Sequence, residues 1–297
     1  MFHELSEPPP AEDTAECLPA GYYDVSAPSQ HDPRWRFAVI ANTIFDDFTT
    51  MTKDQRDVIA NLENFVSPDT QRAFDEMSVA WKMGMILHGL PGTGKTIALK
   101  QAIDFLVGKG CIVLRDPPAS LMGTIVRKAR GGKRPLPISD IILRNARFKA
   151  HRQPVIACVY DECEYPLHMH ESSFLSLLDG MTSSHGVIYL FATNKMCEIP
   201  KRIYARPSRI AYVKEFGLPE NEVVRAYVSG LLKNYSGRSE KMVDEICDAV
   251  EWVGGLVIDE VKSVVISTVT MKLDPKESAK RCLDNRNSSY GTDDSEY

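Results

Sequence analysis

The sequence predicts an α/β fold in which a parallel sheet is followed by a small all-helical domain. Three observations lead to this fold class. A glycine-rich loop stands between a short apolar run and a helical pattern, strand-like runs alternate with helix-like runs through the middle of the chain, and only helical patterns follow from about residue 216. Strands that alternate with helices form parallel sheets, because each helix carries the chain back to the start of the next strand.

The composition is that of an ordinary globular protein. Of the 297 residues, 43% are hydrophobic and 25% charged, and a formal net charge of −5 gives no global reason to expect nucleic acid or an anionic membrane as a partner. The seven cysteines include no C-x-x-C pair, which suits a reducing compartment. The N-terminus lacks a basic-then-apolar signal, and no apolar run is long enough to span a membrane. We therefore expect a cytoplasmic protein without a membrane partner.

Composition and periodicity divide the chain into five parts. Both ends are polar and acidic, with proline frequent in the first of them, and segments of this kind are typically disordered. The predicted parts are a disordered tail at 1–33, a helical or linker segment at 34–75, an α/β domain at 76–215, a helical domain at 216–275 and a polar acidic tail at 276–297.

The loop at 89–96 reads GLPGTGKT and matches the phosphate-binding pattern G-x-x-x-x-G-K-[ST] at every fixed position. Glycines let backbone N–H groups close around phosphate oxygens, and the following helix points the positive end of its dipole at the anion. Lys95 can reach the β- and γ-phosphates, and the Thr96 hydroxyl can ligate Mg²⁺. We expect a nucleoside triphosphate to be held by Pro91, Gly92, Thr93, Gly94, Lys95 and Thr96.

Two carboxylates follow the apolar run at 155–160, which is predicted to form a buried strand. Ligands of open α/β sheets bind at the carboxyl ends of the strands. Asp161 would therefore hold Mg²⁺ through its water shell, and Glu162 would polarise the attacking water as a general base. The simpler alternative is a solvated strand end, which the phosphate-binding lysine upstream disfavours.

A third strand, predicted at 186–192, ends in Thr193 and Asn194. An amide at this edge can hydrogen-bond the attacking water or the γ-phosphate. The tetrapeptide NKMC at 194–197 is similar to the guanine-recognition pattern N-K-x-D, but Cys197 replaces the carboxylate that recognises guanine. ATP is therefore the expected nucleotide, with Mg²⁺ as its cation.

Three further segments resemble motifs of the AAA subgroup of the AAA+ ATPases. They are FLSLLDGM at 174–181, ATN at 192–194 and RPSR at 206–209, and they occur in the order found in that family. Together with the phosphate loop and the two acids, the resemblance covers about residues 60–270. It implies a P-loop NTPase core of the AAA+ type followed by a helical lid. The stretch 65–89 also resembles the mitochondrial translocase that exports a folded iron–sulfur protein.

The resemblance implies that Arg206 and Arg209 act in trans, on ATP bound by a neighbouring copy in a ring, most often a hexamer. A guanidinium is always charged and suits the γ-phosphate charge of the transition state. The gap from Asn194 to Arg206 is slightly longer than in the family, and Ser208 stands where the family has glycine. The sequence therefore leaves open which arginine contacts phosphate.

Two features bear on the substrate. The resemblance places a pore loop at Leu121, Met122 and Gly123, where apolar side chains could grip a polypeptide, although a buried turn is an equal alternative. Residues 117–152 contain nine basic residues and one acid, a net charge of +8, which could follow phosphates or an acidic peptide. A solvated helix face is the simpler explanation of this charge.

The leading hypothesis is an ATP-driven ring motor that remodels or threads a macromolecule, with protein as the favoured substrate. The alternative is a nucleic-acid-directed ATPase, a translocase or loader, that uses the basic segment 117–152. A nucleotide-gated scaffold without useful turnover is a third possibility, and it fits less well because Glu162 and both arginines are present.

Overall fold

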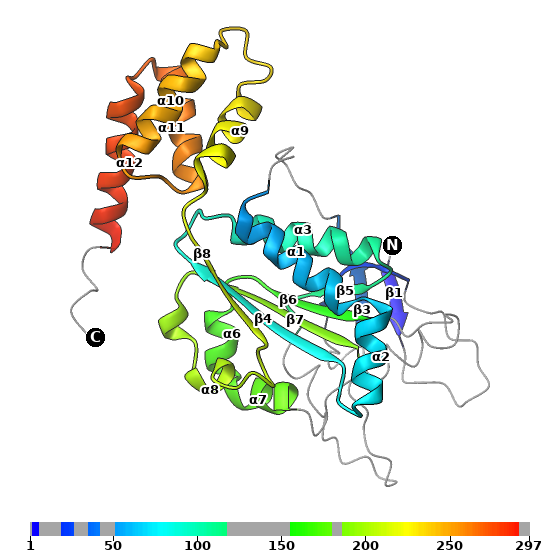
Figure 1. Ribbon diagram of the computed structural model, residues 1–297. Coiled ribbons are helices and arrows are strands. Elements are labelled where there is room, and N and C mark those ends of the chain that lie inside the picture. The colour runs from blue at the N-terminus through cyan, green and yellow to red at the C-terminus, as the bar shows by residue number, and fades with distance from the viewer. Residues whose placement is uncertain are drawn as a thin grey trace, which may run out of the picture. The chain divides into compact units, whose positions relative to one another are not determined.

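The computed structural model describes residues 2–5, 19–26, 35–41, 51–117, 155–179 and 186–290 (Figure 1). The chain divides into two compact units. The sheet unit contains residues 1–43, 58–88 and 96–214, and the loop–helix unit contains residues 44–57, 89–95 and 215–297. This division differs from the five consecutive domains expected from the sequence, because the phosphate loop and the start of α1 (Lys53–Phe65) group with the C-terminal helices.

Eight strands of the described residues form one sheet. They are β1 (Phe2–Leu5), β2 (Gly21–Ser26), β3 (Trp35–Val39), β4 (Lys82–Gly89), β5 (Ile112–Arg115), β6 (Ile156–Tyr160), β7 (Val187–Thr193) and β8 (Tyr212–Phe216). Their order across the sheet is β1-β3-β2-β5-β6-β7-β4-β8. Neighbours from β2 to β4 run parallel, whereas β3 pairs antiparallel with both β1 and β2. The predicted mixed α/β architecture with a mostly parallel sheet is confirmed at this level.

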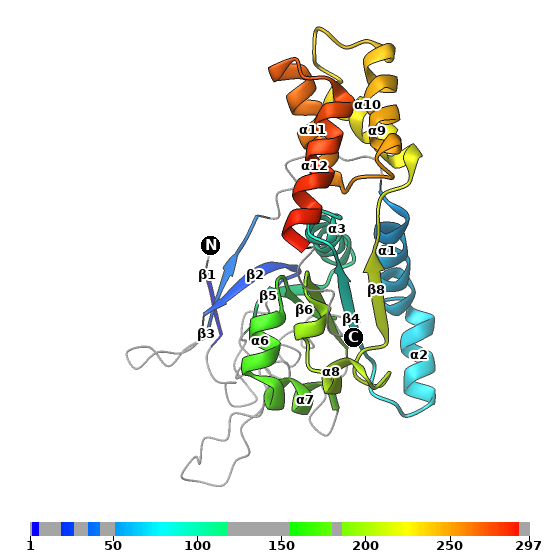
Figure 2. The ribbon, with the colours of Figure 1, turned by 90° about the vertical axis from the view of Figure 1, so that its left-hand side faces the viewer.

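The central strands β6 and β7 are buried along their whole length because helices cover both faces of the sheet. All residues of β6 and β7 are buried, as expected for parallel strands without a solvent face. Helices α1 and α3 (Lys95–Gly108) lie on one face, and α6 (Glu164–Met169), α7 (Glu171–Asp179) and α8 (Lys201–Tyr204) lie on the other (Figures 1 and 2). Among the described residues, this part also contains α2 (Pro68–Glu76) and the 3-10 turn η1 (Met196–Glu198).

The position of β7 matters most for the site. This strand lies between β4 and β6, so the three segments that leave the carboxyl ends of these strands emerge side by side. The register pairs His88 of β4 with Thr193 of β7, and Tyr160 of β6 with Phe191 of β7. The two carboxylates and Asn194 therefore follow strand ends at the same edge of the sheet, the edge at which β4 also ends.

The N-terminal part differs from the prediction of a disordered tail at 1–33. Strand β2 adds to the edge of β5, with Gly21 paired to Ile112 and Asp24 to Arg115. Tyr23 is buried and packs edge-to-face against Phe37 of β3. Acidic and proline residues dominate the composition of this stretch, but they conceal a six-residue run with three strand-forming side chains that covers an otherwise open sheet edge.

Four helices of the loop–helix unit share a hydrophobic core of their own. They are α9 (Asn221–Leu231), α10 (Glu240–Trp252), α11 (Ile258–Met271) and α12 (Pro275–Tyr290). Val228, Ile246 and Val264 are buried in this core, and α12 contributes Ala279. The tail predicted from residue 276 is thus helical as far as Tyr290, because its few apolar side chains fall on one face. None of the helices in the described ranges is long and apolar enough to cross a membrane.

Candidate nucleotide-binding site

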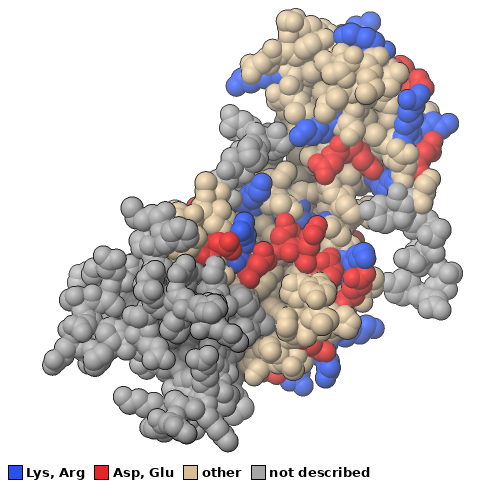
Figure 3. Space-filling model, turned by 180° about the vertical axis from the view of Figure 1, so that it is seen from behind, with Lys and Arg blue, Asp and Glu red and all other residues tan. Residues whose placement is uncertain are grey.

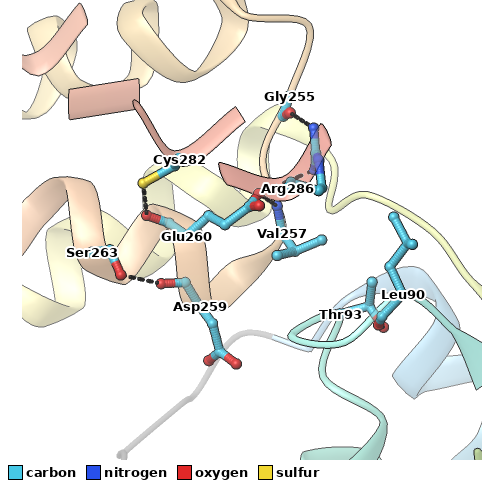
Figure 4. Close-up of polar contacts among 9 residues, drawn as sticks. All are labelled: Leu90, Thr93, Gly255, Val257, Asp259, Glu260, Ser263, Cys282 and Arg286. Atoms are coloured by element: carbon cyan, nitrogen blue, oxygen red, sulfur yellow. Dashed lines mark hydrogen bonds and ion pairs between the residues drawn. The ribbon is translucent and has the colours of Figure 1, made fainter. Parts of the chain in front are cut away.

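The phosphate loop has the backbone shape that its glycines permit. Gly92 and Gly94 have φ values of +79° and +97°, in the region that residues with a Cβ rarely adopt. The Nζ atom of Lys95 donates hydrogen bonds to the carbonyl oxygens of Gly89 at 2.9 Å and Leu90 at 2.7 Å. The Thr93 hydroxyl also donates to the Leu90 oxygen, at 2.8 Å (Figure 4). The loop thus curls around a buried ammonium group.

A glutamine that the sequence reasoning missed supports the loop from α1. Gln55 is buried, and its side-chain nitrogen donates to the carbonyl oxygen of Gly94 at 3.4 Å. Its side-chain oxygen accepts from the Thr52 backbone N–H at 2.9 Å, while the Thr52 hydroxyl accepts from the Gln55 N–H at 3.2 Å. This reciprocal pair is a capping box, and the pattern T-x-x-Q at the start of α1 was the signal that could have revealed it.

The start of α11 also contacts the loop. The backbone N–H of Asp259 lies 3.4 Å from the Gly92 carbonyl oxygen. A Cβ atom on Gly92 would stand 3.0 Å from Val257 and 3.1 Å from Asp259. Glycine at position 92 therefore serves two purposes: it allows the positive φ, and it allows α11 to approach.

An ion pair from α12 holds the start of α11 in place (Figure 4). Arg286 contacts the Glu260 carboxylate at 3.1 Å and donates to the carbonyl oxygen of Gly255 at 3.3 Å. The same carboxylate oxygen accepts from the backbone N–H of Val257 at 3.0 Å. Both charged side chains are about five-sixths buried, with 15% and 16% of their surface exposed. The C-terminal helix is thereby connected, through one carboxylate, to the turn beside the phosphate loop.

The sheet unit carries the acidic half of the site. The Thr96 hydroxyl donates a hydrogen bond to Asp161 Oδ2 at 3.0 Å, although the two residues are 65 positions apart in the chain. Both side chains offer oxygen atoms at an exposed edge, which is the donor chemistry and the access to water that Mg²⁺ requires. The next residue, Glu162, has a φ of +51°, a strained conformation for a residue with a side chain.

A carboxylate that the sequence reasoning missed holds the end of β7. Glu164 opens α6, and one of its oxygens accepts from the Thr193 hydroxyl at 2.5 Å and from the backbone N–H of Asn194 at 2.8 Å. Burial raises the pKa of Glu164, but these hydrogen bonds outweigh it and leave the pKa below its usual value. Only its position three residues after Asp161 marked this glutamate in the sequence.

The two predicted arginines have different environments. Arg209 has 7% of its side chain exposed and forms a two-pronged ion pair with Asp179, from Nε at 2.5 Å and from Nη2 at 2.6 Å. Its third nitrogen donates to the carbonyl oxygen of Arg202. The hydrogen bond to Arg209 also holds the pKa of Asp179 below its usual value. Arg206, by contrast, is 66% exposed and lies 4.0 Å from the same carboxylate.

The arginine segment lies away from the acidic half of the site. The backbone of Arg209 packs directly on Gly84, and the Ala211 N–H donates to the Gly84 carbonyl oxygen at 2.9 Å. Gly84 pairs with Tyr189, four positions before Thr193 on β7. At about 3.3 Å per residue, this is roughly 13 Å along the strand from the end that carries Asn194.

The residues predicted to contact a substrate belong to a part of the chain outside the described ranges. Leu121, Met122 and Gly123, and all nine basic residues of the segment 117–152, lie outside the described residues. Elsewhere, basic and acidic side chains are interspersed over the described surface on the face shown in Figure 3. In the described residues, some charged side chains pair with one another, as Arg225 of α9 does with Asp244 of α10, and Lys241 with Glu245 within α10. The basic composition of the segment 117–152 is therefore the feature of this chain that favours a nucleic-acid partner.

No protein-family model matches the chain. A similarity was found to AAA-ATPase At5g17760 of Arabidopsis thaliana, with 27% identity over 185 residues, which is 60% of this chain. The similarity supports an AAA family assignment. The name of this relative states an ATPase activity for the relative itself. The matched region spans only 35% of the length of that protein.

Proposed function

We propose that this protein is a Mg²⁺-dependent ATPase of the AAA type that works as a ring and remodels or threads a macromolecular substrate, with protein favoured. The observation that carries the proposal is the hydrogen bond of 3.0 Å between the hydroxyl of Thr96 and the carboxylate of Asp161. Thr96 is the last residue of a complete phosphate-binding loop, so this contact joins the loop sequence to an acidic strand end, as Mg²⁺-nucleotide binding requires.

The nucleotide is held by the loop and its neighbours. Backbone N–H groups of residues 92–96 bind phosphate oxygens, while Pro91, which has no N–H, shapes the loop, and the Lys95 ammonium is placed against the β- and γ-phosphates. Thr96 and Asp161 hold the cation, directly or through water, and Mg²⁺ supplies neutralising charge on the phosphate oxygens when bound. Their oxygen donors and exposed position fit this ion.

Hydrolysis is assigned to the side chains that follow β6 and β7. Glu162 orients the attacking water and accepts its proton, and Asn194 donates to that water or to the γ-phosphate oxygen. The positive φ of Glu162 supports this role, because strained residues are concentrated at functional sites. The four-helix part of the loop–helix unit then acts as a lid, with α11 placed beside Gly92.

The arginine segment acts on a neighbouring copy. Its place near Gly84, away from the Asn194 end of the sheet, supports action in trans rather than on the chain's own nucleotide. We assign the phosphate contact to Arg206, which is exposed, and a structural role to Arg209, whose guanidinium already binds Asp179. Sites completed by the next subunit require a closed ring, and a hexamer is the expected size.

The test of the ATPase is the variant Glu162→Gln, which removes the base and keeps the shape of the side chain. We expect ATP hydrolysis to fall by at least about a hundredfold, while affinity for a fluorescent ATP analogue stays within a factor of about two. Glu198→Gln is the matched control, because the Glu198 carboxylate is half exposed and forms a surface ion pair with the side chain of Lys195. Unchanged turnover of Glu162→Gln would contradict the proposed chemistry.

The substrate is tested by stimulation of ATPase activity. Unfolded polypeptide, DNA and RNA are added separately at several salt concentrations. Stimulation by polypeptide supports the protein-directed motor, which the resemblance of residues 65–89 to a protein translocase also favours. Stimulation by nucleic acid that disappears as salt rises would support the alternative, in which the segment 117–152 follows phosphates.

A further inference from the structure

We propose that Glu164 is a positioning residue for ATP hydrolysis, which sets Asn194 relative to Glu162. The inference rests on the proposed ATPase function and adds to it a residue that contacts neither nucleotide nor cation. One carboxylate oxygen of Glu164 accepts hydrogen bonds from the turn that follows β7.

A single oxygen of Glu164 accepts three hydrogen bonds from three consecutive residues. The donors are the hydroxyl of Thr193 at 2.5 Å and the backbone N–H groups of Asn194 at 2.8 Å and Lys195 at 3.3 Å. The Lys195 N–H also reaches the Thr193 hydroxyl oxygen, at 2.9 Å. The backbone on both sides of the Asn194 Cα atom is therefore fixed to the same point.

Glu164 also belongs to the segment that carries the general base. It follows Glu162 by two residues, and the intervening Cys163 donates its backbone N–H to the carbonyl oxygen of Ala192 at 3.0 Å. The turn after β6 and the turn after β7 are thus joined twice, at Cys163 and at Glu164. A displacement of either turn must move the other or break these bonds.

Charge strengthens the contact at Glu164. The low pKa of this carboxyl keeps it ionised near neutral pH, and hydrogen bonds to an ionised acceptor are roughly twice as strong as those between neutral groups. Thr193 is buried, so water cannot readily replace the hydrogen bond of its hydroxyl if the carboxylate is removed. The arrangement is well suited to holding the Asn194 backbone with small positional error, which hydrolysis in a preorganised site requires.

The experiment is a double-mutant cycle with Glu164→Ala, Asn194→Ala and the combined variant, each assayed for kcat, KM and affinity for a fluorescent ATP analogue. We expect Glu164→Ala to lower kcat by about tenfold to a hundredfold, with nucleotide affinity changed by less than about threefold. In the Asn194→Ala background the same change should have almost no further effect, because Glu164 acts through Asn194. Effects that multiply in the combined variant would overturn the inference.

A conservative variant separates positioning from folding. Glu164→Gln keeps an oxygen acceptor of the same reach without the charge, and we expect it to recover part of the lost kcat. Hydrogen exchange at the Asn194 and Lys195 amides should be faster in Glu164→Ala than in the wild type, and intermediate in Glu164→Gln. Equal exchange at these two amides in all three proteins would overturn the inference, and faster exchange confined to them separates lost positioning from general unfolding.

Two outcomes distinguish this inference from the proposed function. A wild-type protein that binds ATP but hydrolyses none would overturn both. A wild-type protein that hydrolyses ATP, together with a Glu164→Ala variant of unchanged kcat, would overturn the role of Glu164 alone. The control Glu198→Ala removes a nearby exposed carboxylate that contacts the Lys195 side chain at 2.7 Å, and it should leave kcat unchanged.

Discussion

Both oxygens of the Asp179 carboxylate accept hydrogen bonds from Arg209, Oδ1 from Nε at 2.5 Å and Oδ2 from Nη2 at 2.6 Å. A planar guanidinium bound in this way has little freedom to reach a ligand on another subunit. Arg206 remains exposed at the same loop. The ion pair therefore separates two arginines that the sequence alone could not distinguish.

The two arginines should respond differently to removal. For Arg206→Ala we expect ATP hydrolysis to fall by about a thousandfold with an unchanged melting temperature, as for loss of an arginine finger. For Arg209→Ala we expect a loss of about 1 to 2 kcal/mol in the free energy of unfolding, since charged hydrogen bonds are lost but Asp179 is partly solvated. ATPase assays and urea denaturation measure the two effects.

Action in trans can be tested by mixing two inactive proteins. Arg206→Ala keeps an intact site, and Glu162→Gln keeps an intact arginine, so mixed rings should contain some complete sites. We expect the mixture to recover part of the wild-type ATPase rate. A mixture of the two variants that hydrolyses ATP no faster than either variant alone would contradict action in trans.

Gly92→Ala should weaken nucleotide binding. The added Cβ would face both the strain of a φ of +79° and contacts of 3.0 to 3.1 Å with the start of α11. We expect ATP affinity to fall by at least about tenfold, measured by titration with a fluorescent analogue. Gly110→Ala is the matched control: its φ is +87° but no atom lies within 4 Å of the new Cβ, so only stability should suffer, by about 1 kcal/mol.

Arg286→Met should destabilise the four-helix part of the loop–helix unit. The change leaves Glu260 mostly buried without its cation and removes the bond to Gly255, so we expect a loss of roughly 1 to 3 kcal/mol in urea denaturation. Arg281→Met is the control on the same helix. Arg281 pairs with Glu277 at an exposed position, and its loss should cost less than about 0.5 kcal/mol.

The contribution of Glu164 to stability should depend on pH. Its pKa in the folded protein lies below the ordinary value for glutamate, so the unfolded chain takes up the proton first as the pH falls. The stabilisation is therefore complete above roughly pH 5 and is lost in more acidic solution. We expect the difference in unfolding free energy between the wild type and Glu164→Gln to be present at neutral pH and to shrink at acidic pH. A difference that grows on acidification would contradict this sign.

The loop and the strand ends could be read from the sequence because their chemistry is local. A phosphate loop needs glycines, a lysine and a threonine at set spacings. Asp161 and Glu162 can be recognised because they follow an apolar run directly. Sequence alone erred where composition was averaged over long stretches. The strand at 21–26 and the helix at 275–290 are short patterns inside polar segments, and their burial depends on partners elsewhere in the fold.

The sequence by itself determined the α/β class, the phosphate loop and the acidic strand end, since each depends on neighbours in the chain. Only the tertiary structure decided three contacts: Arg209 binds Asp179, Glu164 accepts a hydrogen bond from the Asn194 backbone, and Arg286 binds Glu260. These partners are 26 to 30 residues apart in sequence. Strand order and helix packing decide which groups come together over such separations. The same sequence is compatible with many pairings, and the fold selects one of them.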